Sequence, residues 1–142
     1  MVNQDPQPDM FETSATFTDG ASPVGTSVTN TIFTHQGHNE EVRIYALSVQ
    51  VLNSSTQVDI SATAEIDFQI TLIAGPNDVP SNPFDGSWIA RSREQVMALT
   101  CPVLIKFKQP LRVRVEAMEA IDLGTDLEVK IQLIGETGVI KV

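Results

Sequence analysis

The chain has few residues of the kinds that most often carry chemistry or staple a fold. Its 142 residues include one cysteine, two histidines, one tyrosine and one tryptophan. A single cysteine rules out an internal disulfide. The scarcity of histidine, cysteine and tyrosine disfavours a catalytic site built from a nucleophile, a base and an orienting group. No apolar run approaches the roughly 18 residues that span a bilayer, so a transmembrane helix is excluded.

Basic residues are also scarce, and the start of the chain has none. The whole chain carries 9 Lys and Arg against 18 Asp and Glu, and residues 1–42 contain six acidic residues and no basic one. Nucleic-acid binding depends on cationic side chains that displace counterions, and anionic membrane surfaces attract the same side chains. We therefore expect no nucleic-acid partner and no membrane partner. The first residues lack a basic start followed by an apolar run, so we expect no secretion signal.

Residues that favour β-strands are abundant. Valine, isoleucine and threonine make up 40 of the 142 residues, and these β-branched side chains are enriched in strands. Val58–Leu72, Val103–Val115 and Leu127–Leu133 alternate apolar and polar residues with a period of two, which predicts strands with one buried face. Fifteen residues would make an unusually long strand, so we expect a break within Val58–Leu72 near Ser61–Ala64, where the side chains are small.

Other segments are less regular. Val42–Leu52 is apolar at nearly every position, which predicts a central strand covered on both faces. Ala74–Ser87 contains three prolines, two glycines, two asparagines and two aspartates, which predicts a long surface loop. We expect the next strand to start at Trp88-Ile89-Ala90. Gln109-Pro110 interrupts Val103–Val115 because proline donates no backbone hydrogen bond, so a strand pair or an edge strand with a corner is expected there.

These segments together predict an all-β fold. Seven or eight strands with almost no helix indicate an antiparallel β-sandwich over residues 31–142. A jelly roll is the favoured topology. An immunoglobulin-like sandwich is the alternative, although the chain lacks the Cys…Trp…Cys framework. The expected core consists of the inward-facing residues Ile44, Leu47, Val49, Ile66, Phe68, Ile70, Val113, Val115, Val129 and Ile131.

Residues 1–30 form the second expected unit, an extended or flexible N-terminal arm. This segment is rich in Asp, Pro, Ser, Thr and Gly, which interrupt regular structure. A disordered tail, an extended arm and an edge strand over Glu12–Thr18 are all compatible with it. We predict an arm that leaves its own sandwich and docks on a neighbouring subunit or another protein surface. Phe11 and Phe17 would be its apolar anchors.

A row of basic residues is the second candidate contact. Four of the nine basic residues lie on the polar face of Val103–Val115: Lys106, Lys108, Arg112 and Arg114. Three interpretations remain open. The row could pair across strands with the acidic residues Asp59, Glu65 and Asp67. It could instead receive an acidic neighbouring subunit, or it could bind an anionic ligand.

The long loop is the candidate ligand site. Aromatic side chains can stack on sugars, and the residues that could contribute to such a site are Asp78, Phe84, Asp85 and Trp88. The two aspartates resemble half of a calcium site, but the Asp-x-Asp-x-Asp-Gly pattern is absent.

The remaining reactive side chains predict no site. His35 and His38 lack the second cluster that zinc sites usually have, so we expect them in a solvated loop. Cys101 lies between apolar neighbours and is expected to be a small buried hydrophobe. The sequence therefore predicts no catalytic residue, no metal site and no cofactor.

An acidic extended start followed by a Val/Ile/Thr-rich sandwich resembles the small virion proteins of tailed phages, such as capsid decoration (cement) proteins and head-fibre bases. The similar pattern is Phe17–His35 leading into Val42–Leu52, with the late strands Leu111–Val115 and Leu127–Leu133. The resemblance implies a non-enzymatic structural protein, made in the host cytoplasm, that forms a homo-oligomer, commonly a trimer, on the outside of a capsid. A major coat protein is disfavoured because coats that package a genome usually present basic arms. The alternative function is a carbohydrate-binding, lectin-like module.

Overall fold

The computed structural model describes residues 7–34, 40–64, 66–75, 77–106 and 109–139. Eight strands and one short helix follow one another along the chain: β1 (Gln7–Phe17), β2 (Ser27–Thr34), β3 (Glu40–Asn53), β4 (Phe68–Ala74), β5 (Asn77–Asp85), α1 (Gly86–Arg91), β6 (Val96–Ile105), β7 (Pro110–Ala117) and β8 (Leu127–Val139). Within the described residues, no helix is long and apolar enough to cross a membrane. The expected all-β fold is confirmed.

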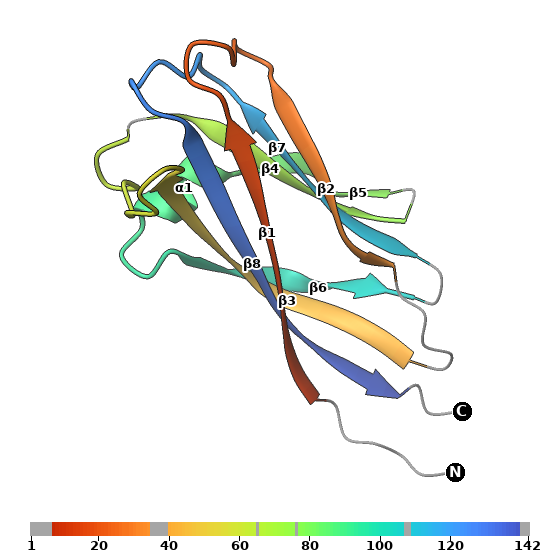
Figure 1. The fold of residues 1–142 in the computed structure, drawn as a ribbon. Helices are drawn as coiled ribbons and strands as arrows, with labels where there is room; N and C mark the ends of the chain where they lie inside the picture. Colours follow the sequence, from red (N-terminus) through yellow and green to blue (C-terminus); the bar gives the residue numbers. More distant parts are fainter. Residues whose placement is uncertain (1–6, 35–39, 65, 76, 107–108, 140–142) are drawn as a thin grey trace.

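The strands form two four-stranded antiparallel sheets that stack face to face (Figure 1). Sheet A has the order β1-β8-β3-β6 and sheet B has the order β2-β7-β4-β5. Strands 1 and 8, 2 and 7, 3 and 6, and 4 and 5 are hydrogen-bonded pairs. A long antiparallel ribbon with its tip between β4 and β5 gives these pairs when it is wrapped into two sheets. This arrangement is the jelly roll, the favoured topology.

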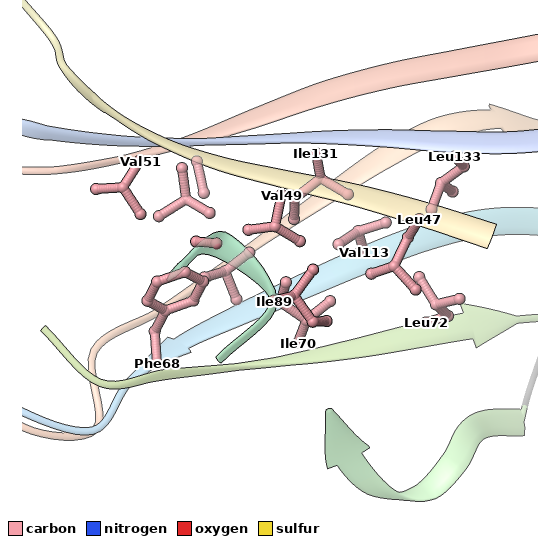
Figure 2. Close-up of a cluster of buried hydrophobic side chains, with 14 of the residues drawn as sticks. Leu47, Val49, Val51, Phe68, Ile70, Leu72, Ile89, Val113, Ile131 and Leu133 are labelled. Atoms are coloured by element: carbon pink, nitrogen blue, oxygen red, sulfur yellow. The ribbon is translucent and has the colours of Figure 1, made fainter. Parts of the chain in front are cut away.

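The core lies between the sheets and consists of the alternating side chains that point inward. Figure 2 shows side chains of β3, β4, β7 and β8 meeting there, together with Ile89 from α1. All ten residues of the expected core are buried, with exposed fractions of 0–7%. Period-two alternation therefore identified the buried faces of β4, β7 and β8 correctly.

The N-terminal segment differs from the predicted arm. β1 pairs over its full length with β8 of the same chain, from Gln7 opposite Thr137 to Phe17 opposite Leu127. Phe17 is only 1% exposed and belongs to the core, and Phe11 is partly buried against it. β2 also lies within sheet B. The backbone hydrogen bonds and the burial of Phe17 hold this segment in its own sandwich, so residue 30 is not a domain boundary.

β3 is central in sheet A, but only one of its faces is covered, so the prediction of two covered faces is wrong. Arg43 and Tyr45 are exposed on the outer face. A bulge at Tyr45 shifts the register against both neighbouring strands. The bulge puts Tyr45 and Ala46 on the outer face together. The bulge therefore interrupts the alternation. The buried apolar residues of β3 are even-numbered before the bulge and odd-numbered after it, up to Val51.

The bulge requires a glycine on the neighbouring strand. Gly135 of β8 lies opposite Ile44, directly beside the bulge. A Cβ atom at residue 135 would collide with the carbonyl oxygen of Arg43 and come within 3.1 Å of the Ile44 Cα atom. Only glycine allows the two backbones to approach this closely.

Three further segments differ from expectation. Of Val58–Leu72, only the part from Phe68 onward is a strand; the expected break is present as a turn at residues 61–63. Ala74–Ser87 was predicted to be a loop but contains β5, because its prolines are tolerated on the edge of a sheet. Trp88-Ile89-Ala90 belongs to α1 rather than to a strand. The predicted interruption at Gln109-Pro110 is confirmed, since β6 ends at Ile105 in sheet A and β7 begins at Pro110 in sheet B.

Candidate functional site

Three of the four predicted ligand residues, Phe84, Asp85 and Trp88, lie where β5 ends and α1 begins (Figure 1), whereas Asp78 lies near the start of β5, opposite Ile73. Asp85 is the N-cap of this helix, and its Oδ1 accepts hydrogen bonds from the Trp88 backbone N–H at 3.1 Å and from the Ser87 hydroxyl. Phe84 is partly buried and packs against the core. The side chain of Asp78 lies outside the described residues. Two of the four predicted ligand residues, Phe84 and Asp85, therefore stabilise the fold.

A capping role for Asp85 predicts a moderate loss of stability when its carboxylate is removed. We expect Asp85→Ala to lower the free energy of unfolding by about 0.5–2 kcal/mol, because the N–H groups at the start of α1 lose their acceptor. Urea denaturation followed by tryptophan fluorescence measures the change. The control is Asp122→Ala, at an exposed position, with an expected change within about 0.5 kcal/mol. Equal midpoints for the two variants would contradict the capping role.

Trp88 is the remaining ligand candidate. Its side chain is 65% exposed, and acidic and basic groups lie on the same turn. Arg91 Nη1 lies 3.8 Å from Asp67 Oδ1, and the Ser87 hydroxyl lies within hydrogen-bond distance of both Asp67 Oδ1 and Asp85 Oδ1, to either of which it can donate. An exposed indole beside polar groups can stack on a flat apolar ligand face. The Asp67 and Asp85 carboxylates already accept hydrogen bonds from this chain. They are therefore only partly available to bind a ligand beside Trp88.

Asp59 lies in a second polar cluster near this end of the sandwich. Its carboxylate accepts hydrogen bonds from the Ser61 backbone and hydroxyl and from Gln95 Nε2 at 3.2 Å. The Ser61 hydroxyl in turn accepts a bond from the Val51 backbone N–H at 2.9 Å. Burial alone would raise the pKa of Asp59, but these hydrogen bonds outweigh it and lower the pKa. The cluster links the 54–67 connection to β3 and to the segment before β6.

The lowered pKa of Asp59 predicts a pH dependence. The ionised carboxylate stabilises the fold above its unfolded-state pKa, near 3.8, and this contribution disappears as the pH falls through the lower folded-state pKa. We expect Asp59→Asn to lower stability by about 1 kcal/mol at pH 7, a modest effect because the group is mostly solvated. Urea midpoints between pH 7 and pH 2.5 should converge for wild type and variant. A gap that stays constant with pH would contradict this role of the charge.

The basic row is only partly assembled. Arg112 and Arg114 are half-buried on the outer face of sheet B, where the register puts Thr31 and Ile73 beside Arg112 and Thr29 and Thr71 beside Arg114. Lys106 is exposed in the connection after β6, and Lys108 lies outside the described residues. Arg112 Nη2 donates to the Gly75 carbonyl oxygen at 3.4 Å, and its Nε is buried without a partner among the described residues.

In the described strands, the register does not place Asp59 or Asp67 beside Arg112 or Arg114. Asp59 and Asp67 lie in the 54–67 connection rather than on a strand beside β7, and Glu65 lies outside the described residues. Asp67 pairs with Arg91 instead. The interpretations that remain for the row are pairing with Glu65, a subunit contact and anion binding.

Other reactive side chains give no assembled site in the part of the chain that the structure describes. No group of three or more His, Cys, Asp or Glu side chains is placed to hold a metal ion there. His35 and His38 fall outside the described residues. Cys101 is exposed, so the prediction of a buried side chain is wrong. It lies between Ala98 and Val103, where a register shift leaves several β6 residues without partners on β3.

The outer face of sheet A carries a feature that sequence analysis missed. Met10, Ile134, Ala46 and Ala98 are direct cross-strand neighbours, and they form one apolar row across β1, β8, β3 and β6. Met10 is 57% exposed, Ala98 is also exposed, and Ile134 and Ala46 are half-buried. Tyr45, Val96 and Leu104, all at least 37% exposed, flank the row. Only the strand register brings these residues together, because they are far apart in the sequence.

Charged residues border the apolar row on the side toward the end of β8. Arg43 and Glu136 are cross-strand neighbours there. The Tyr45 hydroxyl donates to Glu136 Oε1 at 2.6 Å, and Arg43 Nη2 donates to Glu41 Oε2 at 2.9 Å. The hydrogen bonds to Glu41 are the main reason that the pKa of Arg43 is raised. Tyr45 and Arg43 are thus held in place on this face.

No protein-family model matches the chain, and a search of the curated proteins finds no match.

Proposed function

We propose that the protein is a non-enzymatic structural protein of a virus particle, and that it decorates the exterior of a capsid as a homo-oligomer. The observation that carries the proposal is the strand order of the two sheets, 1-8-3-6 and 2-7-4-5. Eight-stranded jelly rolls of this kind recur in viral capsid proteins and in lectins. The support is therefore a fold-level analogy, joined to the pattern similarity with small virion proteins of tailed phages.

The charge distribution supports an exterior position rather than contact with the genome. The net charge is −9, and the first basic residue in the sequence is Arg43. A surface of this sign is repelled by phosphate, whereas genome-facing coat proteins need cations to displace counterions. Synthesis in the host cytoplasm and attachment to the finished capsid from outside are part of the same proposal.

Purified virus particles from the source of the gene provide the test. We expect peptides of this chain in the mass spectrum of intact particles, and antibodies against it should label particles that have not been opened. Label that appears only after disruption would contradict the exterior position. A chain that is present in infected cells but absent from particles would contradict the structural role itself.

A lectin-like module is the second candidate, and the exposed Trp88 favours it. We expect such a module to bind a glycan array, and Trp88→Ala should abolish the signal because the stacking surface is lost. Glycan binding that survives this substitution would remove Trp88 from the site. A chain that binds no glycan leaves the structural role as the sole candidate.

A further inference from the structure

The geometry points to a symmetric contact between two copies of this chain through the outer face of sheet A. The apolar row defined above has two large side chains on one half of the sheet, Met10 and Ile134, and two small ones on the other half, Ala46 and Ala98. Four of the nine large hydrophobic residues that are exposed among the described residues lie on this same face. A face of this kind needs a partner surface with the opposite arrangement of large and small side chains.

A second copy supplies that surface. Consider a two-fold axis that lies parallel to the strands, between β8 and β3. It places β8 of one copy over β3 of the other, and β1 over β6, and it keeps each row of residues at the same level. Met10 then meets Ala98 of the second copy, and Ile134 meets Ala46. Large side chains pack on small ones across the whole row, as they do between the two sheets of a sandwich.

The charged border is complementary under the same symmetry. Arg43 on β3 and Glu136 on β8 lie at one level, so each Arg43 faces Glu136 of the other copy, twice per contact. One Glu136 oxygen accepts from Tyr45, and Glu41 takes the Nε and one Nη2 donor of Arg43. A guanidinium has five donors and a carboxylate has several acceptor positions. Both groups therefore retain capacity for the second copy.

The contact is isologous, which means that it closes after two copies. It gives dimers in place of the trimer that the resemblance to phage proteins implies. A face four strands wide, with strands about 4.8 Å apart, belongs to the small end of specific interfaces. We therefore expect a dissociation constant in the micromolar range. The inference is independent of where the protein acts, since a dimer can form on a capsid or in solution.

Charge-reversal variants of Arg43 and Glu136 distinguish a contact between two copies from an interaction within one chain. In a homodimer of Arg43→Glu, the introduced carboxylate faces Glu136 of the other copy. In a homodimer of Glu136→Arg, the introduced guanidinium group faces Arg43 of the other copy. Each variant should raise the dissociation constant of its homodimer by about tenfold or more. An equimolar mixture of the two variants restores both opposite-charge pairs, so it should form a one-to-one heterodimer with nearly the wild-type constant.

Sedimentation equilibrium of the full chain measures all three constants, and native mass spectrometry identifies the heterodimer. The matched control is Thr31→Glu, an exposed position on the outer face of sheet B, which should leave the wild-type constant unchanged. A wild-type chain that remains monomeric at about 500 µM, far above the expected range, would overturn the inference. Two variants that stay apart when mixed, or that dimerise as well as wild type, would overturn it too.

Discussion

Replacing Gly135 with alanine should cost about 3 kcal/mol or more of folding free energy, the upper part of the range for overpacking. The new Cβ atom would meet the Arg43 carbonyl oxygen and the Ile44 Cα atom, both of which belong to the backbone of β3. A side chain could rotate away from such a contact, but a strand hydrogen-bonded on both edges has little room to move. For a domain of about 140 residues, a loss of this size lowers the melting temperature by roughly 6–15 °C.

Differential scanning calorimetry of wild type and Gly135→Ala measures this effect. Thr16→Ala, at an exposed position on β1, is the control, and its melting temperature should differ little from that of wild type. A Gly135→Ala variant as stable as this control would mean that β3 and β8 are not in close contact at the bulge. The register on either side of Tyr45 would then be wrong.

Phe17→Ala should have the other largest effect, a loss of about 3–5 kcal/mol. The ring is 1% exposed and forms part of the core, so truncation leaves a cavity between the sheets. Phe11→Ala should cost clearly less, because Phe11 is only partly buried. Deleting Gln7–Phe17 entirely should prevent stable folding, since it removes an edge of sheet A together with its contribution to the core.

Urea denaturation at two protein concentrations tests this prediction and distinguishes it from an arm that docks on a neighbour. If β1 belongs to its own sandwich, the Phe17→Ala loss is the same at about 5 µM and 200 µM, because the contact is intramolecular. A loss that depends strongly on concentration would show that the phenylalanine packs on another copy. An unchanged midpoint would show that β1 is not part of the core.

The alternation of apolar and polar residues was sufficient to predict strands that have one apolar face and one polar face. The alternation of β7 and β8 identified Val113, Val115, Val129 and Ile131 as core residues, because a half-buried strand needs apolar side chains at every second position. β3 shows no such alternation along its whole length, because the Tyr45 bulge puts two consecutive residues on one face. This is why the sequence led to the wrong prediction of two covered faces.

Elements that depend on tertiary contacts were not predictable from local sequence. β5 contains prolines and turn residues and becomes a strand only because it pairs with the edge of β4. α1 is six residues long and depends on the Asp85 cap and on burial of Ile89, so its apolar residues looked like the start of a strand. An edge strand over Glu12–Thr18 was one of the open alternatives, but the local sequence could not select it, since its partner β8 is distant in the sequence.

The two candidate surfaces also differ in whether the local sequence reveals them. The basic row was visible in the sequence because its members fall at even-numbered positions of one short segment, 106–114, although only Arg112 and Arg114 are described on a common strand, β7. The apolar row on sheet A was invisible, because it takes one residue from each of four strands. Neither hydropathy nor spacing along the chain brings Met10, Ile134, Ala46 and Ala98 together; the register does.

The pairing of β1 with β8 has a consequence for synthesis on the ribosome. Glu12 and its hydrogen-bond partner Gln132 are 120 residues apart. At about 5–20 residues per second, β1 leaves the ribosome roughly 6–24 s before its partner exists. During that time Phe17 has no core to enter, and the sandwich cannot close. Such long-range pairing slows folding, so the nascent chain is open to chaperones, and to pairing with other nascent copies, until β8 emerges.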